Sequence, residues 1–333
     1  MVYRHNYPFF FAIKASLTTP VVNYPLENRT PKQQGLTSAA RFRICCQVND
    51  RLYGVSWSPR TMADPTRISL NTATLQQWSL RECVEGCVRY DISAIGPWRN
   101  KVHDLGLETA THVIDDHGLQ VSSLCRGGMF TSLDDAGQRQ AFDENRAAID
   151  EAAALGAACL VLVVGGIPEG SKNIGAARAQ VVDGIGSLLD YARSARVPLA
   201  IEPLHPMYAA DRACINTLSQ ANDVCDQLGE GVGVAIDVYH VWWDPELEKE
   251  IARARNRILG FHVSDWLLAT QDLLLDRGMM GDGVIDIPQI QNWVKKAGYK
   301  GPIEVEIFSA ENWWKRDGNE VLETILSRFS NYV

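Results

Sequence analysis

From Arg67 to the end of the chain, short apolar runs alternate with stretches of helical periodicity eight times. Apolar runs bounded by turn-prone residues are typical of buried parallel strands. The predicted strands are 67–71, 91–97, 120–125, 159–164, 198–203, 233–238, 259–264 and 303–308, and the predicted helices lie near 74–88, 100–116, 134–155, 174–195, 215–228, 245–255, 287–297 and 318–330. Eight strand–helix units in about 270 residues predict a closed (β/α)₈ TIM barrel. The alternative is an open doubly wound sheet, which binds its ligand at one switch point with few strands.

Four successive strands carry, at or near their C-terminal ends, a residue that can bind a divalent metal: Glu202, Asp237, His262 and Glu306. A buried carboxylate or imidazole at such a position is costly unless something pairs with it. Three carboxylates and one imidazole suit a single Mn²⁺, Mg²⁺, Co²⁺ or Zn²⁺ ion. Adjacent strands lie about 4.8 Å apart, so these tips converge on one centre in a barrel. The pattern therefore favours the barrel and predicts a metalloenzyme.

The last strand offers two carboxylates on the same face, Glu304 and Glu306. Side chains two residues apart in a strand point to the same side, so position along the barrel axis decides between them. Glu306 is nearer the C-terminal rim and is the predicted ligand. Glu304 lies deeper and is interpreted as structural.

Five motifs resemble those of the xylose isomerase-like TIM barrels, the sugar phosphate isomerase/epimerase superfamily. They are Ile201-Glu-Pro203, Asp237-Val-Tyr-His240, Phe261-His-Val-Ser-Asp265, Arg277-Gly-Met-Met-Gly-Asp-Gly283 and Gly298-Tyr-Lys-Gly-Pro-Ile-Glu-Val-Glu306. The resemblance runs from about Ile68 to Phe329 and is specific only when the motifs are taken together. It implies that the four strand-tip residues bind one divalent metal.

The resemblance also implies a reaction and a substrate class. The expected substrate is a small carbohydrate, a sugar, sugar phosphate or keto-polyol, in which a hydroxyl neighbours a carbonyl. A Lewis-acid metal makes the C–H between these groups acidic enough to lose its proton. Glu202 and Glu306 are the expected catalytic pair, one removing the proton to give an enediolate and the other returning it. The expected enzyme is an isomerase or epimerase.

Several further residues are expected to contact the substrate. The resemblance assigns this role to His240 and Arg277. Without a functional role, His240 would be an ordinary packed histidine and Arg277 part of a surface ion pair. His205 lies just past a strand tip and is expected to line the pocket. Trp266 is predicted to form an aromatic wall for a sugar, together with other tryptophans near strand exits (Trp98, Trp242 and Trp243), although tryptophans also simply pack. Asp265 either orients His262 or caps the following loop.

Two other functions remain open, and a third is disfavoured. A dehydratase or lyase acting on a keto-inositol or 3-keto-sugar would use the same metal and proton abstraction, then expel a hydroxyl. A non-enzymatic sugar-binding barrel would not need two opposed carboxylates. An endonuclease IV-type enzyme of the same superfamily needs additional histidines, and here Gly278 follows Asp276-Arg277 where that motif has a histidine.

Residues 1–61 differ from the rest and are expected to be a poorly structured extension, or a stretch upstream of a genuine start at Met62, with the barrel spanning 62–333. They hold eight basic and two acidic residues, which leaves 24 basic and 38 acidic residues for the remainder. This excess of acidic residues would repel a phosphate backbone and disfavours nucleic acid as a partner. No apolar run reaches the roughly 20 residues of a membrane span. The eight cysteines form no disulfide framework, which favours the cytoplasm, and a homo-oligomer is left open.

Overall fold

The computed structural model describes residues 64–333, which form one compact unit. The prediction made for residues 1–61 falls outside the described residues. No helix between residues 64 and 333 is long and apolar enough to cross a membrane.

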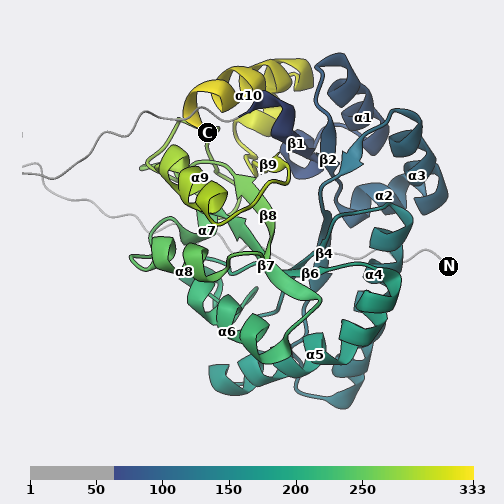
Figure 1. Cartoon of the computed structure of the whole chain (residues 1–333), viewed down its shortest axis with the longest axis vertical. Coiled ribbons are helices and arrows are strands. Elements are labelled where there is room, and N and C mark those ends of the chain that lie inside the picture. The colour runs from purple at the N-terminus through teal and green to yellow at the C-terminus, as the bar shows by residue number, and fades with distance from the viewer. Residues whose placement is uncertain (1–63) are drawn as a thin grey trace, which may run out of the picture. The chain divides into compact units, whose positions relative to one another are not determined.

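Parallel strands form the centre of this unit, and helices surround them (Figure 1). The strands are β1 (Ile68–Asn71), β2 (Ala94–Gly96), β3 (Gln120–Val121), β4 (Leu124–Gly128), β5 (Leu160–Val163), β6 (Leu199–Ile201), β7 (Val232–Asp237), β8 (Ile258–Val263) and β9 (Ile303–Val305). Their order in the sheet is β3-β2-β1-β9-β8-β7-β6-β5-β4. β1 pairs with both β2 and β9, so the first and last strands lie side by side. The predicted TIM barrel is confirmed.

The third predicted strand, 120–125, is divided in two. Its first part, β3, pairs with β2, and its second part, β4, pairs with β5. A bridge between Trp98 and Cys125 links the exit of β2 to β4 and nearly closes the cylinder. The nine strands therefore occupy eight positions around the barrel.

The surrounding helices follow the predicted rhythm. They are α1 (Leu80–Arg89), α2 (Arg99–Leu105), α3 (Leu107–Asp116), α4 (Asp135–Ala154), α5 (Ile174–Ala195), α6 (Leu218–Leu228), α7 (Val238–Val241), α8 (Leu247–Arg253), α9 (Ile287–Lys296) and α10 (Gly318–Tyr332). Side-chain caps explain several starts: Asp134 accepts a hydrogen bond from the Gly137 amide, and Asp286 accepts one from the Gln289 amide, as an N-cap residue does.

Two predicted helices were wrong in their continuity or start. The stretch 100–116 is broken at Gly106, whose φ of 87° no helix accommodates, into α2 and α3. The stretch 74–88 begins as a short 3₁₀ turn and becomes α-helical only at Leu80, where Ser79 and Glu82 form a capping box.

Small side chains fill part of the barrel interior. Cys125, Cys159, Val161, Ala200 and Ala235 form a cluster separate from the larger core between strands and helices. Their neighbours along the same strands, such as Leu160, Leu162, Leu199 and Ile201, belong to the larger core.

Candidate metal and active site

The four predicted metal ligands lie together at the C-terminal ends of neighbouring strands. Glu202 directly follows β6, Asp237 ends β7, His262 is the penultimate residue of β8, and Glu306 directly follows β9. All four side chains are buried, and their ligand atoms lie within 4.8 Å of one another. The pairing of β7 with β8 sets Asp237 directly beside His262.

Several ligand atoms of this group lack a hydrogen-bond partner. His262 Nδ1 lies 3.4 Å from Glu202 Oε1 and 3.8 Å from Glu306 Oε2. Neither nitrogen of His262, nor Glu202 Oε1, has a partner with hydrogen-bond geometry. A buried polar atom left in this state normally costs about 1–3 kcal/mol. These atoms suit a bound cation, which would satisfy them together.

The local charge also fits a divalent cation. Two positive side chains, Arg277 and His262 when protonated, lie among four buried carboxylates, those of Glu202, Asp237, Glu304 and Glu306. Uncompensated charge is unfavourable in a buried site. A divalent ion would offset most of this negative charge, although His262 must give up its proton to bind it.

The two carboxylates predicted to transfer protons sit in different electrostatic surroundings. Burial raises the pKa of Glu202 to about 7, although His262 beside it acts in the opposite direction. Burial also acts to raise the pKa of Glu306, but His262 and Arg277 outweigh it and hold that pKa below its usual value. Burial by itself lowers the pKa of His262; the surrounding carboxylates, Glu304 foremost, more than offset this and hold it well above its usual value. Such divergence between neighbouring groups is typical of acid–base sites.

Arg277 is buried at the centre of the site, which excludes the surface ion pair considered from the sequence. Its Nη1 atom lies 2.8 Å from Asp237 Oδ2 and 3.3 Å from Glu306 Oε2. The guanidinium lies over the rings of Tyr239 and Phe308, at 4.4 and 4.9 Å from their centroids, a cation–π arrangement that sequence reasoning missed. Burial acts to lower the pKa of Arg277, but the carboxylates raise it above its ordinary value.

His240 adjoins Arg277 and the metal ligand Asp237. Burial lowers the pKa of His240 to about 3, so its imidazole is neutral at physiological pH. Its Nε2 lies 3.2 Å from Arg277 Nη2 and, facing a group that can only donate, must act as the acceptor. The hydrogen of the neutral ring is therefore assigned to Nδ1, which is buried and has no partner.

Aromatic rings surround this centre. His205 packs against Trp266 and Trp243, at centroid distances of 5.1 and 5.5 Å, and Trp266 stacks on Tyr239 at 4.8 Å. Trp98 packs edge-on against Phe308. The buried indole nitrogens of Trp98 and Trp242 have no hydrogen-bond partner. The predicted aromatic residues thus pack on one another and on Tyr239 and Phe308, the two rings that contact Arg277.

The structure decides between the two roles considered for Asp265. Its carboxylate accepts hydrogen bonds from four backbone amides, those of Trp266, Gly281, Gly283 and Ile285. Asp265 therefore caps the loop that follows β8. The carboxylate that faces the second ring nitrogen of His262 is Glu304, which the sequence did not identify in that position.

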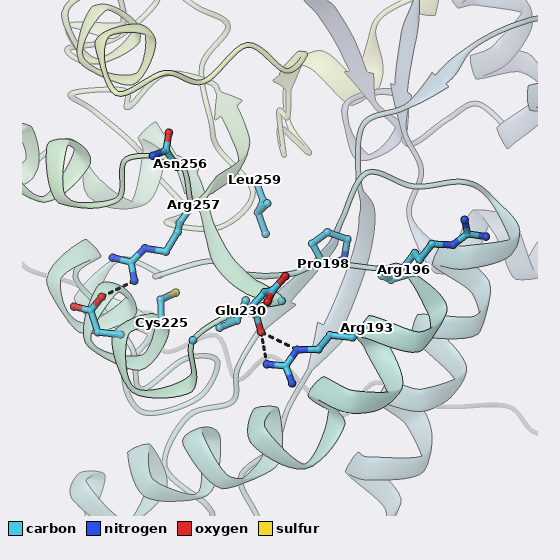
Figure 2. A pocket seen from close by; sticks show the side chains of 13 residues that line it. Arg193, Arg196, Pro198, Cys225, Glu230, Asn256, Arg257 and Leu259 are labelled. Atoms are coloured by element: carbon cyan, nitrogen blue, oxygen red, sulfur yellow. Dashed lines mark hydrogen bonds and ion pairs between the residues drawn. The ribbon is translucent and has the colours of Figure 1, made fainter.

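A cavity of about 670 Å³ lies at the opposite end of the strands (Figure 2). Its lining includes Pro198 and Val232, at the N-terminal ends of β6 and β7. Of its arginines, Arg193 binds the Glu230 carbonyl and Arg257 binds Asp226. This cavity is separate from the buried carboxylates and is not the site of their chemistry.

The sequence model described as xylose isomerase-like TIM barrel matches residues 84–325. The chain belongs to this family. Among solved structures, protein SMc04130 from Sinorhizobium meliloti 1021 is 56% identical, with a TM-score of 0.80 over 81% of this chain and 99% of that one. The IolI protein with a bound zinc atom has the same fold, with 21% identity and a TM-score of 0.69 over 80% of this chain and 99% of that one.

Curated relatives of this family member carry out sugar chemistry. An L-ribulose-5-phosphate 3-epimerase, UlaE, from Salmonella typhi is 27% identical over 60% of this chain and 69% of its own length. An inosose isomerase from Halalkalibacterium halodurans is 23% identical over 75% of this chain and 90% of its own length.

Proposed function

We propose that this chain is a divalent-metal-dependent isomerase or epimerase of a small sugar, sugar phosphate or keto-polyol, working by proton transfer through an enediolate. One observation carries the proposal: Glu202 and Glu306, on non-adjacent strands, are buried in one group with Asp237 and His262. Two carboxylates on different sides of a shared centre suit removal and return of a proton. The activities of UlaE and of the inosose isomerase belong to the same general kind.

Glu202, Asp237, His262 and Glu306 would hold the metal ion. When bound, the ion supplies Lewis-acid polarisation of the substrate carbonyl and hydroxyl. Carboxylate oxygens with one imidazole nitrogen suit Mn²⁺, Co²⁺ and Zn²⁺, and Mg²⁺ less well. IolI, which has the same fold, binds a zinc atom.

The chain's own groups divide the remaining work. A carboxylate oxygen of Glu202 or Glu306 takes the proton from the carbon between the two substrate oxygens, and the other carboxylate returns it. Arg277 is positioned to neutralise charge that develops on a substrate oxygen. The unpartnered Nδ1–H of His240 is a donor for another substrate oxygen. His205, Trp266 and their aromatic neighbours bound the apolar faces of the sugar and exclude water.

A dehydratase acting on a keto-inositol or 3-keto-sugar is the second candidate. It would use the same metal-binding group, one carboxylate removing the proton and the other passing a proton to the departing hydroxyl. The six cysteines of the described residues are free and buried, and we place either enzyme in the cytoplasm.

Incubation with Mn²⁺ and a panel of ketoses and inososes in D₂O tests the proposal. An isomerase or epimerase gives a product whose mass is unchanged apart from deuterium exchanged at carbon, whereas a dehydratase gives loss of water. No turnover of any carbohydrate by the metal-loaded protein would count against both enzymes.

Glu306→Gln separates an enzyme from a sugar-binding barrel. The amide cannot accept a proton, so we expect turnover to fall by about 10²-fold or more. Ligand affinity, measured by calorimetry, should change far less. Full activity of this variant would refute the assignment of the acid–base pair.

A further inference from the structure

The Glu304 carboxylate is buried beneath the metal-binding group, on the far side of the His262 ring. Glu304 and His262 are directly paired residues of β9 and β8. Glu304 Oε1 lies 3.6 Å from His262 Nε2, whereas Nδ1 of the same ring faces Glu202 and Glu306. The two ring nitrogens therefore have separate surroundings: one faces the candidate metal centre, and the other faces a lone carboxylate.

Two neighbouring strands bound this carboxylate. Asn71, at the end of β1, donates from Nδ2 to Glu304 Oε2 at 3.1 Å. The Asn71 amide cannot be reversed, since its Oδ1 accepts from the Ala73 amide. At the end of β2, a Cβ on Gly96 would lie 2.2 Å from Glu304 Oε2, so glycine leaves the space that the carboxylate occupies. The hydrogen bond from Asn71 and the limited space beside Gly96 together indicate a fixed orientation.

We propose that Glu304 is a positioning residue that keeps the hydrogen of His262 on Nε2 and its lone pair on Nδ1, toward the metal. In neutral imidazole one nitrogen donates and the other accepts, so a carboxylate beside Nε2 selects the tautomer that can ligate through Nδ1. This inference rests on the metal site of the proposed function. Asp265, the other candidate for this role, is occupied by four backbone amides.

Glu304→Gln makes a sharp test because Asn71 fixes the orientation of the new amide. The amide oxygen must face the Asn71 donor, so the NH₂ group faces His262 Nε2 and donates to it. The imidazole hydrogen then moves to Nδ1, where it blocks ligation. We expect affinity for Zn²⁺ or Mn²⁺, measured by competition with a chelator, to fall about 10–100-fold. Glu304→Ala should lose no more than Glu304→Gln, although it removes more of the side chain.

Glu250→Gln is the matched control. Glu250 is another buried carboxylate that accepts from an asparagine, Asn222, but it lies on α8 and has no contact with the metal-binding group. The metal affinity of the Glu250→Gln variant should stay within about twofold of that of the wild type. ¹⁵N NMR of labelled histidine supplies a readout of the tautomer itself: in the zinc-loaded wild type, Nε2 of His262 should carry the hydrogen.

Each outcome has a definite meaning. Failure of the wild type to bind one equivalent of metal removes the proposed function as well. Binding by the wild type with unchanged affinity in Glu304→Gln, or a His262 hydrogen on Nδ1 in the loaded wild type, overturns the positioning role alone. If Glu304→Gln does not fold, Asn71→Ala releases the same carboxylate without altering it and should weaken metal binding by about tenfold; unchanged affinity in that variant also overturns the inference.

Discussion

At the scale of single residues, the ionisation of the metal-binding group is set by what each side chain faces. Burial raises the pKa of Glu202, and the carboxylates of Glu306 and Asp237 act in the same direction. His262 and the guanidinium of Arg277 instead hold the pKa of Glu306 below its usual value. Two chemically identical carboxyls, which sequence alone cannot tell apart, therefore differ in their readiness to hold a proton. His262, surrounded by carboxylates, also holds one.

Metal uptake should release protons. Without metal at pH 7, His262 is protonated and Glu202, with a pKa of about 7, is about half protonated, and a cation must displace these protons. Metal affinity should therefore rise with pH. It should fall as the pH drops below 7, by about tenfold per pH unit for each proton displaced. Calorimetric titration in buffers of different ionisation enthalpy measures the number released. A binding enthalpy independent of the buffer would contradict this picture.

At the scale of elements, one side chain ties the two ends of the loop after β8 together. Each carboxylate oxygen of Asp265 accepts from two backbone amides: Oδ1 from Trp266 and Ile285, and Oδ2 from Gly281 and Gly283. The loop also carries Arg277 into the site. The backbone amide of Arg277 donates a hydrogen bond to the Phe308 carbonyl. One carboxylate therefore organises the segment that delivers the guanidinium.

Asp265→Asn should loosen this loop. One oxygen becomes an NH₂ group that faces two backbone donors, and leaving buried donors unpaired costs about 1–3 kcal/mol each. We expect faster hydrogen exchange at the amides of Trp266, Gly281, Gly283 and Ile285 and a lower melting temperature. Exchange in α4, on another part of the barrel, serves as the internal control and should not change. Equal protection of the loop in both proteins would show that other contacts hold it.

The elements and the strand tips were predictable because each is encoded within a short stretch of sequence. Apolar runs marked β6 to β9, and the carboxylates and imidazole stood at or next to their ends. Which carboxylate faces the second ring nitrogen of His262 was not predictable. Glu304 lies there because β9 pairs with β8, and a pairing between two distant strands is not encoded in either segment alone. Gly106 was a missed local signal, since a glycine within a helical pattern often marks its end. The split of the third strand depends on its partners on both sides.

At the scale of the whole molecule, the metal should act as a stabilising ligand of the folded barrel. The unfolded chain cannot bring together residues from β6, β7, β8 and the end of β9, so binding adds to the free energy of unfolding. At a free metal concentration of 100 times Kd, this contribution is about 2.7 kcal/mol. Melting followed by circular dichroism, with EDTA and then with excess Mn²⁺, measures it. Identical melting curves would argue against a site that forms only on folding.

The division between β3 and β4 gives the cylinder a seam. Every other pair of neighbouring strands shares two or more paired positions. Between the end of β2 and β4, a single bridge joins Trp98 to Cys125. Trp98 also rests on Phe308, one of the rings that cradle Arg277. Local opening of the barrel wall at this bridge would therefore displace Trp98 first and, through Phe308, reach the guanidinium of Arg277.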